Sequence, residues 1–169
     1  MIAGAAASAC FATSEAPSQR GNFQSLEGQW SCKGYFVASG KPISSELRFE
    51  RDAGTSTLIV KHDDRASGRY HALELWSPGN AQQSMRASIA DAYGGMRWFE
   101  SAGWDGATLT WTRRENDHDV EQFAYRLNAS GSLNVDWSTR RGDGPMALGD
   151  TITCVKQAWA DDGRERRRS

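Results

Sequence analysis

A strict alternation of large apolar and small polar residues from Ala107 to Arg113 constrains the fold of this chain more than any other feature. A period of two places successive side chains on opposite faces of an extended strand, so that one face is buried and the other meets water. Similar short segments recur along the sequence at the spacing of roughly 8–12 residues that is typical of all-β barrels and sandwiches. The sequence therefore predicts an all-β fold, a single antiparallel up-and-down β-barrel of about 8–10 strands.

The composition fits such a barrel and argues against two classes of partner. The chain has 169 residues, and its seven Trp and 17 Gly against four Pro suit twisted strands with tight turns and a bulky interior. Lys and Arg total 20 against 21 Asp and Glu, which leaves no global basic field of the kind used by nucleic-acid binders. No apolar stretch approaches the roughly 18 residues of a membrane span. We expect no nucleic-acid partner and no transmembrane segment.

The sequence divides into a barrel, residues 26–157, between two polar or small-residue ends. Residues 1–25 are expected to be a signal-like segment and linker, and residues 158–169 a charged, disordered tail. Ala7-Ser8-Ala9 has the A-x-A form of a signal cleavage site, and its place before Cys10 also resembles a bacterial lipobox. A start codon further upstream and a disordered Ala-rich terminus are the alternatives. We expect a periplasmic or secreted protein, with Cys10 as a candidate lipid anchor.

The other two cysteines lie on the first and last predicted strands. These strands are neighbours in a closed meander, so the sequence predicts a disulfide between Cys32 and Cys154. Two buried free thiols are the alternative. Neither cysteine has a second ligand at metal-site spacing, and no metal site is expected.

The hairpins can be registered by requiring that apolar residues share one face. The turn at Asn128 to Gly131 then pairs Phe123 with Trp137, and the preceding loop sets Trp111 against Phe123. Extending the register over four strands gives two interior rows, which are Met96, Trp111, Phe123 and Trp137, and Trp98, Leu109, Tyr125 and Val135. Aromatic rows of this kind either line a ligand cavity or fill a small barrel, and the sequence leaves both interpretations open.

The motif Gly28-Gln29-Trp30 stands at the start of the first predicted strand. It resembles the G-x-W signature of the calycins, the group that contains lipocalins, fatty-acid-binding proteins and avidins. The resemblance implies that Trp30 closes one end of the barrel and that a basic residue of a late strand, Arg140 or Lys156, packs over its ring. At the level of the fold it covers about residues 26–157. In character the chain is most similar to uncharacterised lipocalin-like secreted proteins of bacteria.

Several polar residues could carry chemistry. His62 and His118 each stand beside carboxylates, a combination that can form a metal site or an acid–base pair, but both are expected in solvated turns. Counted in steps of two along their strands, Glu100 and Arg113 fall on the same face as the interior rows. They lie near opposite ends of the predicted barrel. An inward Arg113 could hold a ligand carboxylate or phosphate, and the alternative is that both side chains reach water at flared strand ends. Asp150 is expected to serve a turn.

These observations predict a secreted or periplasmic lipocalin-like barrel that binds a small, partly apolar or amphipathic molecule without transforming it and without a cofactor. The predicted ligand-binding residues are Trp98, Trp111, Arg113, Phe123, Tyr125 and Trp137. One alternative is a protein-binding module, such as a secreted hydrolase inhibitor that works through loops at a barrel mouth. A second alternative is a barrel enzyme that uses His62 or His118, although no familiar catalytic motif is present.

Overall fold

The fold is built from eleven strands, and no helix occurs in the residues that the structure describes. The structure is a computed structural model, and it describes residues 23–65, 70–79, 84–114 and 118–158. In chain order the strands are β1 (Gly28–Phe36), β2 (Pro42–Arg51), β3 (Leu58–Asp64), β4 (His71–Ser77), β5 (Met85–Asp91), β6 (Met96–Ser101), β7 (Trp104–Asp105), β8 (Thr108–Arg114), β9 (Val120–Leu127), β10 (Leu133–Arg140) and β11 (Ala147–Lys156). Within these ranges no helix is long and apolar enough to cross a membrane.

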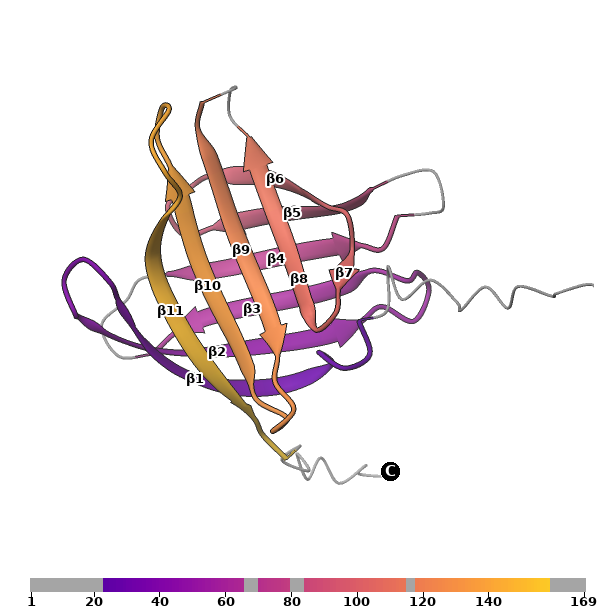
Figure 1. Cartoon of the computed structure of the whole chain (residues 1–169). Coiled ribbons are helices and arrows are strands. Elements are labelled where there is room, and N and C mark those ends of the chain that lie inside the picture. The colour runs from indigo at the N-terminus through magenta and orange to yellow at the C-terminus, as the bar shows by residue number, and fades with distance from the viewer. Residues whose placement is uncertain (1–22, 66–69, 80–83, 115–117, 159–169) are drawn as a thin grey trace, which may run out of the picture.

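The strands form one antiparallel sheet that closes on itself (Figure 1). Their order is β6-β5-β4-β3-β2-β1-β11-β10-β9-β8-β7, and a further pairing of β6 with β8 completes a ten-strand barrel with β7 as a short extra strand. Almost all neighbours in the sheet are also neighbours in sequence, as expected for hairpin connections. The prediction of a single up-and-down barrel is confirmed.

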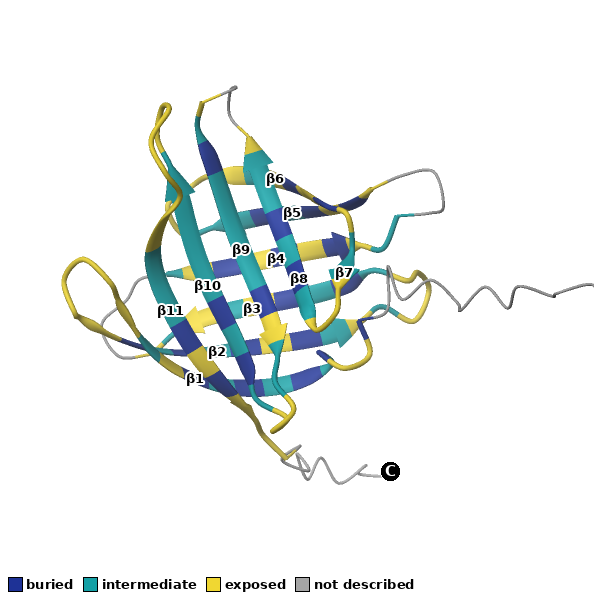
Figure 2. Ribbon diagram, in the orientation of Figure 1, coloured by how far each residue is buried: buried dark blue, intermediate teal, exposed yellow. Residues whose placement is uncertain are grey.

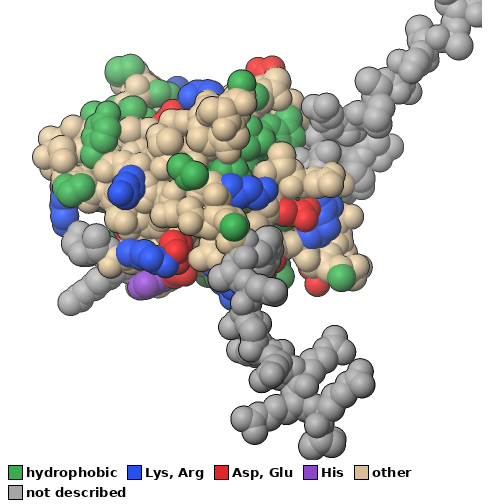
Figure 3. Space-filling view, turned by 90° about the horizontal axis from the view of Figure 1, so that it is seen from below, with side chains coloured by type: hydrophobic (Ala, Val, Ile, Leu, Met, Phe, Trp, Pro, Cys, Tyr) green, Lys and Arg blue, Asp and Glu red, His purple; other side chains and the backbone are tan. Residues whose placement is uncertain are grey.

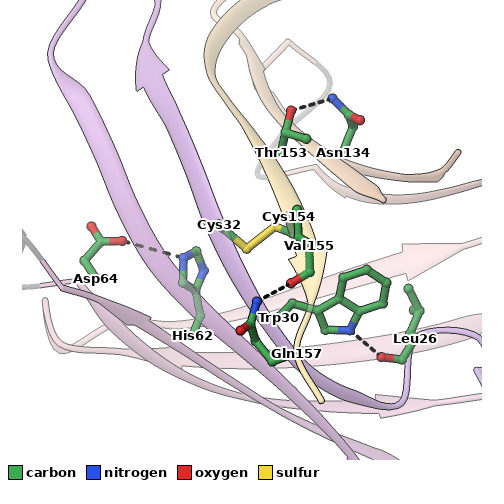
Figure 4. Close-up of a disulfide and its surroundings, with 10 residues drawn as sticks. All are labelled: Leu26, Trp30, Cys32, His62, Asp64, Asn134, Thr153, Cys154, Val155 and Gln157. Carbon is green, nitrogen blue, oxygen red and sulfur yellow. Dashed lines mark hydrogen bonds and ion pairs between the residues drawn. A yellow bond between two sulfur atoms is a disulfide. The ribbon is translucent and has the colours of Figure 1, made fainter. Parts of the chain in front are cut away.

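The first and last strands meet along the seam of the barrel. Cys32 of β1 lies directly opposite Cys154 of β11, and the two side chains form a disulfide, as predicted (Figure 4). Gly34 lies two residues further along β1, where a Cβ atom would lie 1.9 Å from the carbonyl oxygen of Thr151. The close approach of β1 and β11 therefore requires glycine at this position.

The predicted register holds across β8, β9 and β10. Trp111 pairs with Phe123 and Phe123 with Trp137, and the second row likewise joins Leu109, Tyr125 and Val135. Along these strands buried residues alternate with more exposed ones, most clearly on β8 (Figure 2). The alternation of residue types in the sequence therefore corresponds to side chains that point alternately into and out of the barrel.

The predicted register is wrong for β6. Met96 and Trp98 are 61% and 66% exposed, whereas Phe99 is buried and packs against Phe123. Glu100 pairs with Thr112, and Trp104 pairs with Leu109. Glu100 and Trp104 are four positions apart, whereas their two partners on β8 are three positions apart. The extra residue lies next to Gly103, whose φ of 102° bends the chain. Such a bulge reverses which face of β6 is buried.

Trp30 lies near the start of β1, directly opposite Lys156 of β11. Its ring is buried, and its Nε1–H donates a hydrogen bond of 2.8 Å to the carbonyl oxygen of Leu26 (Figure 4). Lys156, one of the two predicted basic residues, places its Nζ 5.2 Å from the centre of the ring. Gly28 has a φ of 123°, and a Cβ atom there would lie 2.9 Å from Cε of Lys156. The glycine of the motif therefore leaves room for the lysine over the tryptophan.

The folded region begins earlier than the predicted boundary at residue 26. Phe23, assigned to the linker from the sequence, is fully buried and packs edge-on against Trp76 at 5.9 Å between ring centres. The calls on residues 1–22, including the signal-like segment and Cys10, lie outside the described residues, as does the tail from residue 159.

Charged side chains of both signs are present on one face of the barrel. On the face seen in Figure 3, basic and acidic side chains are interspersed, and neither sign forms a large continuous area. This distribution matches the net charge of −1.

Candidate functional site

The interior of the barrel divides into a packed half and a cavity half. In the packed half, Trp76 contacts the rings of Phe23, Phe49, Trp111 and Tyr125 at centre distances of 4.9–5.9 Å. The cavity half contains an open-mouthed cavity of about 530 Å³. The lining residues are Phe36, Lys41, Pro42, Ile43, Ser44, Leu47, His62, Asp64, Tyr70, Glu74, Asp91, Tyr93, Arg97, Phe123, Tyr125, Val135, Trp137, Asp150 and Ile152. The barrel is therefore both filled and hollow, in different halves.

Trp137 forms part of the apolar wall, and a bulge positions it. Trp137 pairs with Asp150 but the next residue, Ser138, pairs with Leu148, so Gly149 is the extra residue of β11. A Cβ atom on Gly149 would lie 2.3 Å from the Trp137 ring. The indole therefore lies against a glycine, and its Nε1–H donates a hydrogen bond of 3.0 Å to Glu121. Ring position and wall shape both depend on this bulge.

His62 lies in the cavity wall, and the prediction that it occupies a solvated turn is wrong. Strand β3 continues through Asp64, because the inward alternation of Leu58 and Val60 extends to His62 and Asp64. Burial lowers the pKa of His62 to about 4, so the imidazole is neutral near pH 7. Its Nε2 is buried without a hydrogen-bond partner, and it lies 3.7 Å from Oδ1 of Asp64, beyond hydrogen-bond distance (Figure 4).

Arg97 connects several strands at the edge of the cavity. Its guanidinium is ion-paired with Asp91, at 2.9 Å, and with Glu121 of β9, and it donates a hydrogen bond of 3.2 Å to the hydroxyl of Tyr70. Arg113 binds the other carboxylate oxygen of Glu121 at 3.1 Å. The positive charges of the two arginines are therefore neutralised by the negative charges of Asp91 and Glu121. Arg97 Nε remains buried without a partner.

Three further carboxyl groups face the cavity, and their pKa values are raised. Burial raises the pKa of Glu74 to about 7, against the opposing effect of a 2.7 Å hydrogen bond from Nε1–H of Trp76. Burial, together with the negative charge of Asp64, raises the pKa of Asp150 to about 6. Burial also raises the pKa of Asp64 itself. Raised values mark carboxylates that lack enough compensating positive charge.

The structure brings half of the six predicted ligand-binding residues to the cavity. Phe123, Tyr125 and Trp137 line it. Trp111 is buried in the packed half against Trp76, and Trp98 lies on the outer surface. Arg113 contacts Glu121 and does not line the cavity, whereas Arg97, which was not among the predicted residues, does.

Of the other three candidate residues, one lines the cavity and two are exposed. Glu100 is exposed and ion-paired with Arg86, so its predicted inward parity is wrong, as for the rest of β6. Asp150, predicted in a turn, lines the cavity. His118 is exposed and lies 2.8 Å from Asp143. Among the described ranges, no group of three or more His, Cys, Asp or Glu side chains could hold a metal ion.

Comparisons with known proteins add a fold but no family. No family model matches the sequence, and no curated protein matches it. The crystal structure of Rv2717c from M. tuberculosis is similar, with a TM-score of 0.58 and 13% sequence identity over 80% of this chain and 95% of that chain. At this identity the likeness shows the fold alone, a closed antiparallel β-barrel.

Proposed function

We propose that this protein is a calycin-like barrel that binds a small, partly apolar molecule in its cavity and does not transform it. The observation that carries the proposal is a cavity of about 530 Å³ in one half of the barrel. Ligand pockets of proteins have volumes of roughly 300–1,000 Å³, with mainly apolar walls and a few convergent polar groups. Ile43, Val135 and Ile152 supply apolar wall here, and Phe123 and Trp137 supply aromatic wall.

The assignment to the calycins rests on the barrel end. Gly28, Trp30 and Lys156 have the arrangement that the G-x-W resemblance implies. The structural likeness to another closed barrel is compatible with this assignment.

We also propose that the protein acts outside the cytoplasm. Disulfides persist in oxidising compartments and are rare in the cytosol, so the Cys32–Cys154 bond supports export. The signal-like sequence before Cys10 points in the same direction.

The proposal can be tested with Nile red, an uncharged dye whose fluorescence rises in apolar surroundings. We expect the purified protein to bind the dye, and Val135→Trp to weaken binding by about tenfold or more because the new ring occupies the cavity. Leu75→Trp is the matched control, since Leu75 is 47% exposed on the outer face of β4. Equal dye binding by the wild type and both variants would show that the cavity is not the site.

A further inference from the structure

The cavity wall carries more negative than positive groups. The acidic residues that line it are Asp64, Glu74, Asp91 and Asp150, and the basic ones are Lys41 and Arg97. Arg97 is already neutralised by Asp91 and by Glu121, and Lys41, in the connection between β1 and β2, is exposed. His62 adds no positive charge near pH 7. The uncompensated charge of the interior is therefore negative.

A ring nitrogen of His62 and a carboxylate oxygen of Asp64 face the same space without a direct hydrogen bond between them. Nε2 of His62 has no partner, and Oδ1 of Asp64 lies 3.7 Å away, too far for a direct hydrogen bond. In the neutral tautomer with its proton on Nδ1, His62 presents Nε2 as an acceptor, and a carboxylate accepts through both oxygens. An ammonium group has three donors and no acceptor, so one ammonium can donate to both residues at once.

Asp150 lies close enough for its charge to interact with Asp64. The charge of Asp64 contributes to the raised pKa of Asp150, and both carboxyl groups line the cavity. A buried charge requires an opposite charge or several hydrogen bonds. A cation at this position would supply both.

We propose that the ligand is an organic amine whose protonated nitrogen binds between His62, Asp64 and Asp150, and whose apolar part lies along Ile43, Ile152 and Trp137. This inference rests on the proposed function, because it names the chemical class of the molecule that occupies the same cavity. The tryptophan ring adds a face that attracts cations. The apolar wall favours an alkyl or aryl amine over a bare metal ion.

The test compares three probes with the same chain length, n-decylamine, 1-decanol and decanoate, by calorimetric titration and by displacement of Nile red. At pH 7.5 we expect decylamine to bind about tenfold more tightly than decanol or better, because hydrogen bonds to charged groups are the stronger ones. We expect decanoate to bind most weakly, since its carboxylate meets uncompensated negative charge.

Two nearly isosteric variants locate the amine. Asp64→Asn and Asp150→Asn should each weaken decylamine binding by about tenfold more than they weaken decanol binding. Glu100→Gln is the control, because Glu100 is exposed on the outer face and pairs with Arg86. Thermal melting of each variant checks folding.

The wild-type protein gives a second readout that needs no variant. Asp150, with a pKa of about 6, gains a proton as the pH falls, so decylamine affinity should drop between pH 7.5 and pH 5 while decanol affinity stays level. Glu74 also gains a proton in this range and adds to the same trend.

The outcomes separate the two proposals. Decanol binding as tight as decylamine binding, or a preference for decanoate, would overturn the amine assignment and leave the ligand-binding function in place. If Nile red and all three probes fail to bind, the proposed function itself is wrong.

Discussion

The packed half and the cavity half are made by the same strands, yet the residues in them differ in kind. Around Trp76 the inward positions are aromatic or aliphatic, and the rings meet at 4.9–5.9 Å. On the cavity side the inward positions carry His62, Asp64, Arg97 and Asp150. Burying such groups costs free energy unless they are paired, whereas burying rings stabilises the fold. The packed half therefore holds the barrel together, and the cavity half contains the polar groups to which we propose that a ligand binds.

The largest expected effect comes from removing the central ring of the packed half. Trp76→Ala should lower the free energy of unfolding by about 3–5 kcal/mol, because it leaves a void among four aromatic neighbours. Trp137→Ala should cost much less stability but should abolish ligand binding. Urea denaturation and Nile red titration measure the two effects. Similar stability losses in both variants would show that the two halves do not differ as described.

The disulfide lies on the seam that both halves share. Replacing Cys32 and Cys154 with Ser should lower the free energy of unfolding by about 2–5 kcal/mol, since the bond closes a long loop with a sequence separation of 122 residues. Ligand preference should not change in the protein that remains folded. An altered order of affinities among the three probes would mean that the seam shapes the cavity directly.

A smaller, pH-dependent effect comes from Glu74, which lies on the boundary between the halves. Because its pKa rises to about 7 on folding, the folded protein holds the proton more tightly than the unfolded chain, and stability falls as the pH rises from about 4.5 to about 7. Glu74→Gln keeps an acceptor for Trp76 and removes this cost. We expect similar melting temperatures at pH 5 and a stabilisation of about 1–3 kcal/mol at pH 8. A variant that is less stable than the wild type at pH 8 would contradict the assignment.

The sequence predicted the fold well because the alternation and the hairpin turns determine the register of neighbouring strands. The rows from Trp111 to Trp137 and from Leu109 to Val135 are confirmed. The site was predicted less well, for two physical reasons. A single extra residue near Gly103 reversed β6, which exposed Trp98 and turned Arg97 inward.

The second reason concerns polar residues inside strands. Consecutive Asp residues favour turns, so the sequence predicts a turn at His62, although the inward period from Leu58 continues through His62 to Asp64. Following the two-residue alternation from Leu58 as far as Asp64 would have predicted that His62 and Asp64 point into the barrel. No comparable signal in the sequence marks the bulge at Gly149 that positions Trp137.

The division into two halves is tested most directly by the indole N–H signals in a ¹⁵N–¹H NMR titration with n-decylamine. The signal of Trp137 should shift with increasing ligand, because this ring lines the cavity. The signals of Trp30, Trp76 and Trp111, which lie away from the cavity in the packed interior, should stay in place. A titration that moves Trp76 or the exposed Trp98 and leaves Trp137 unchanged would contradict the account.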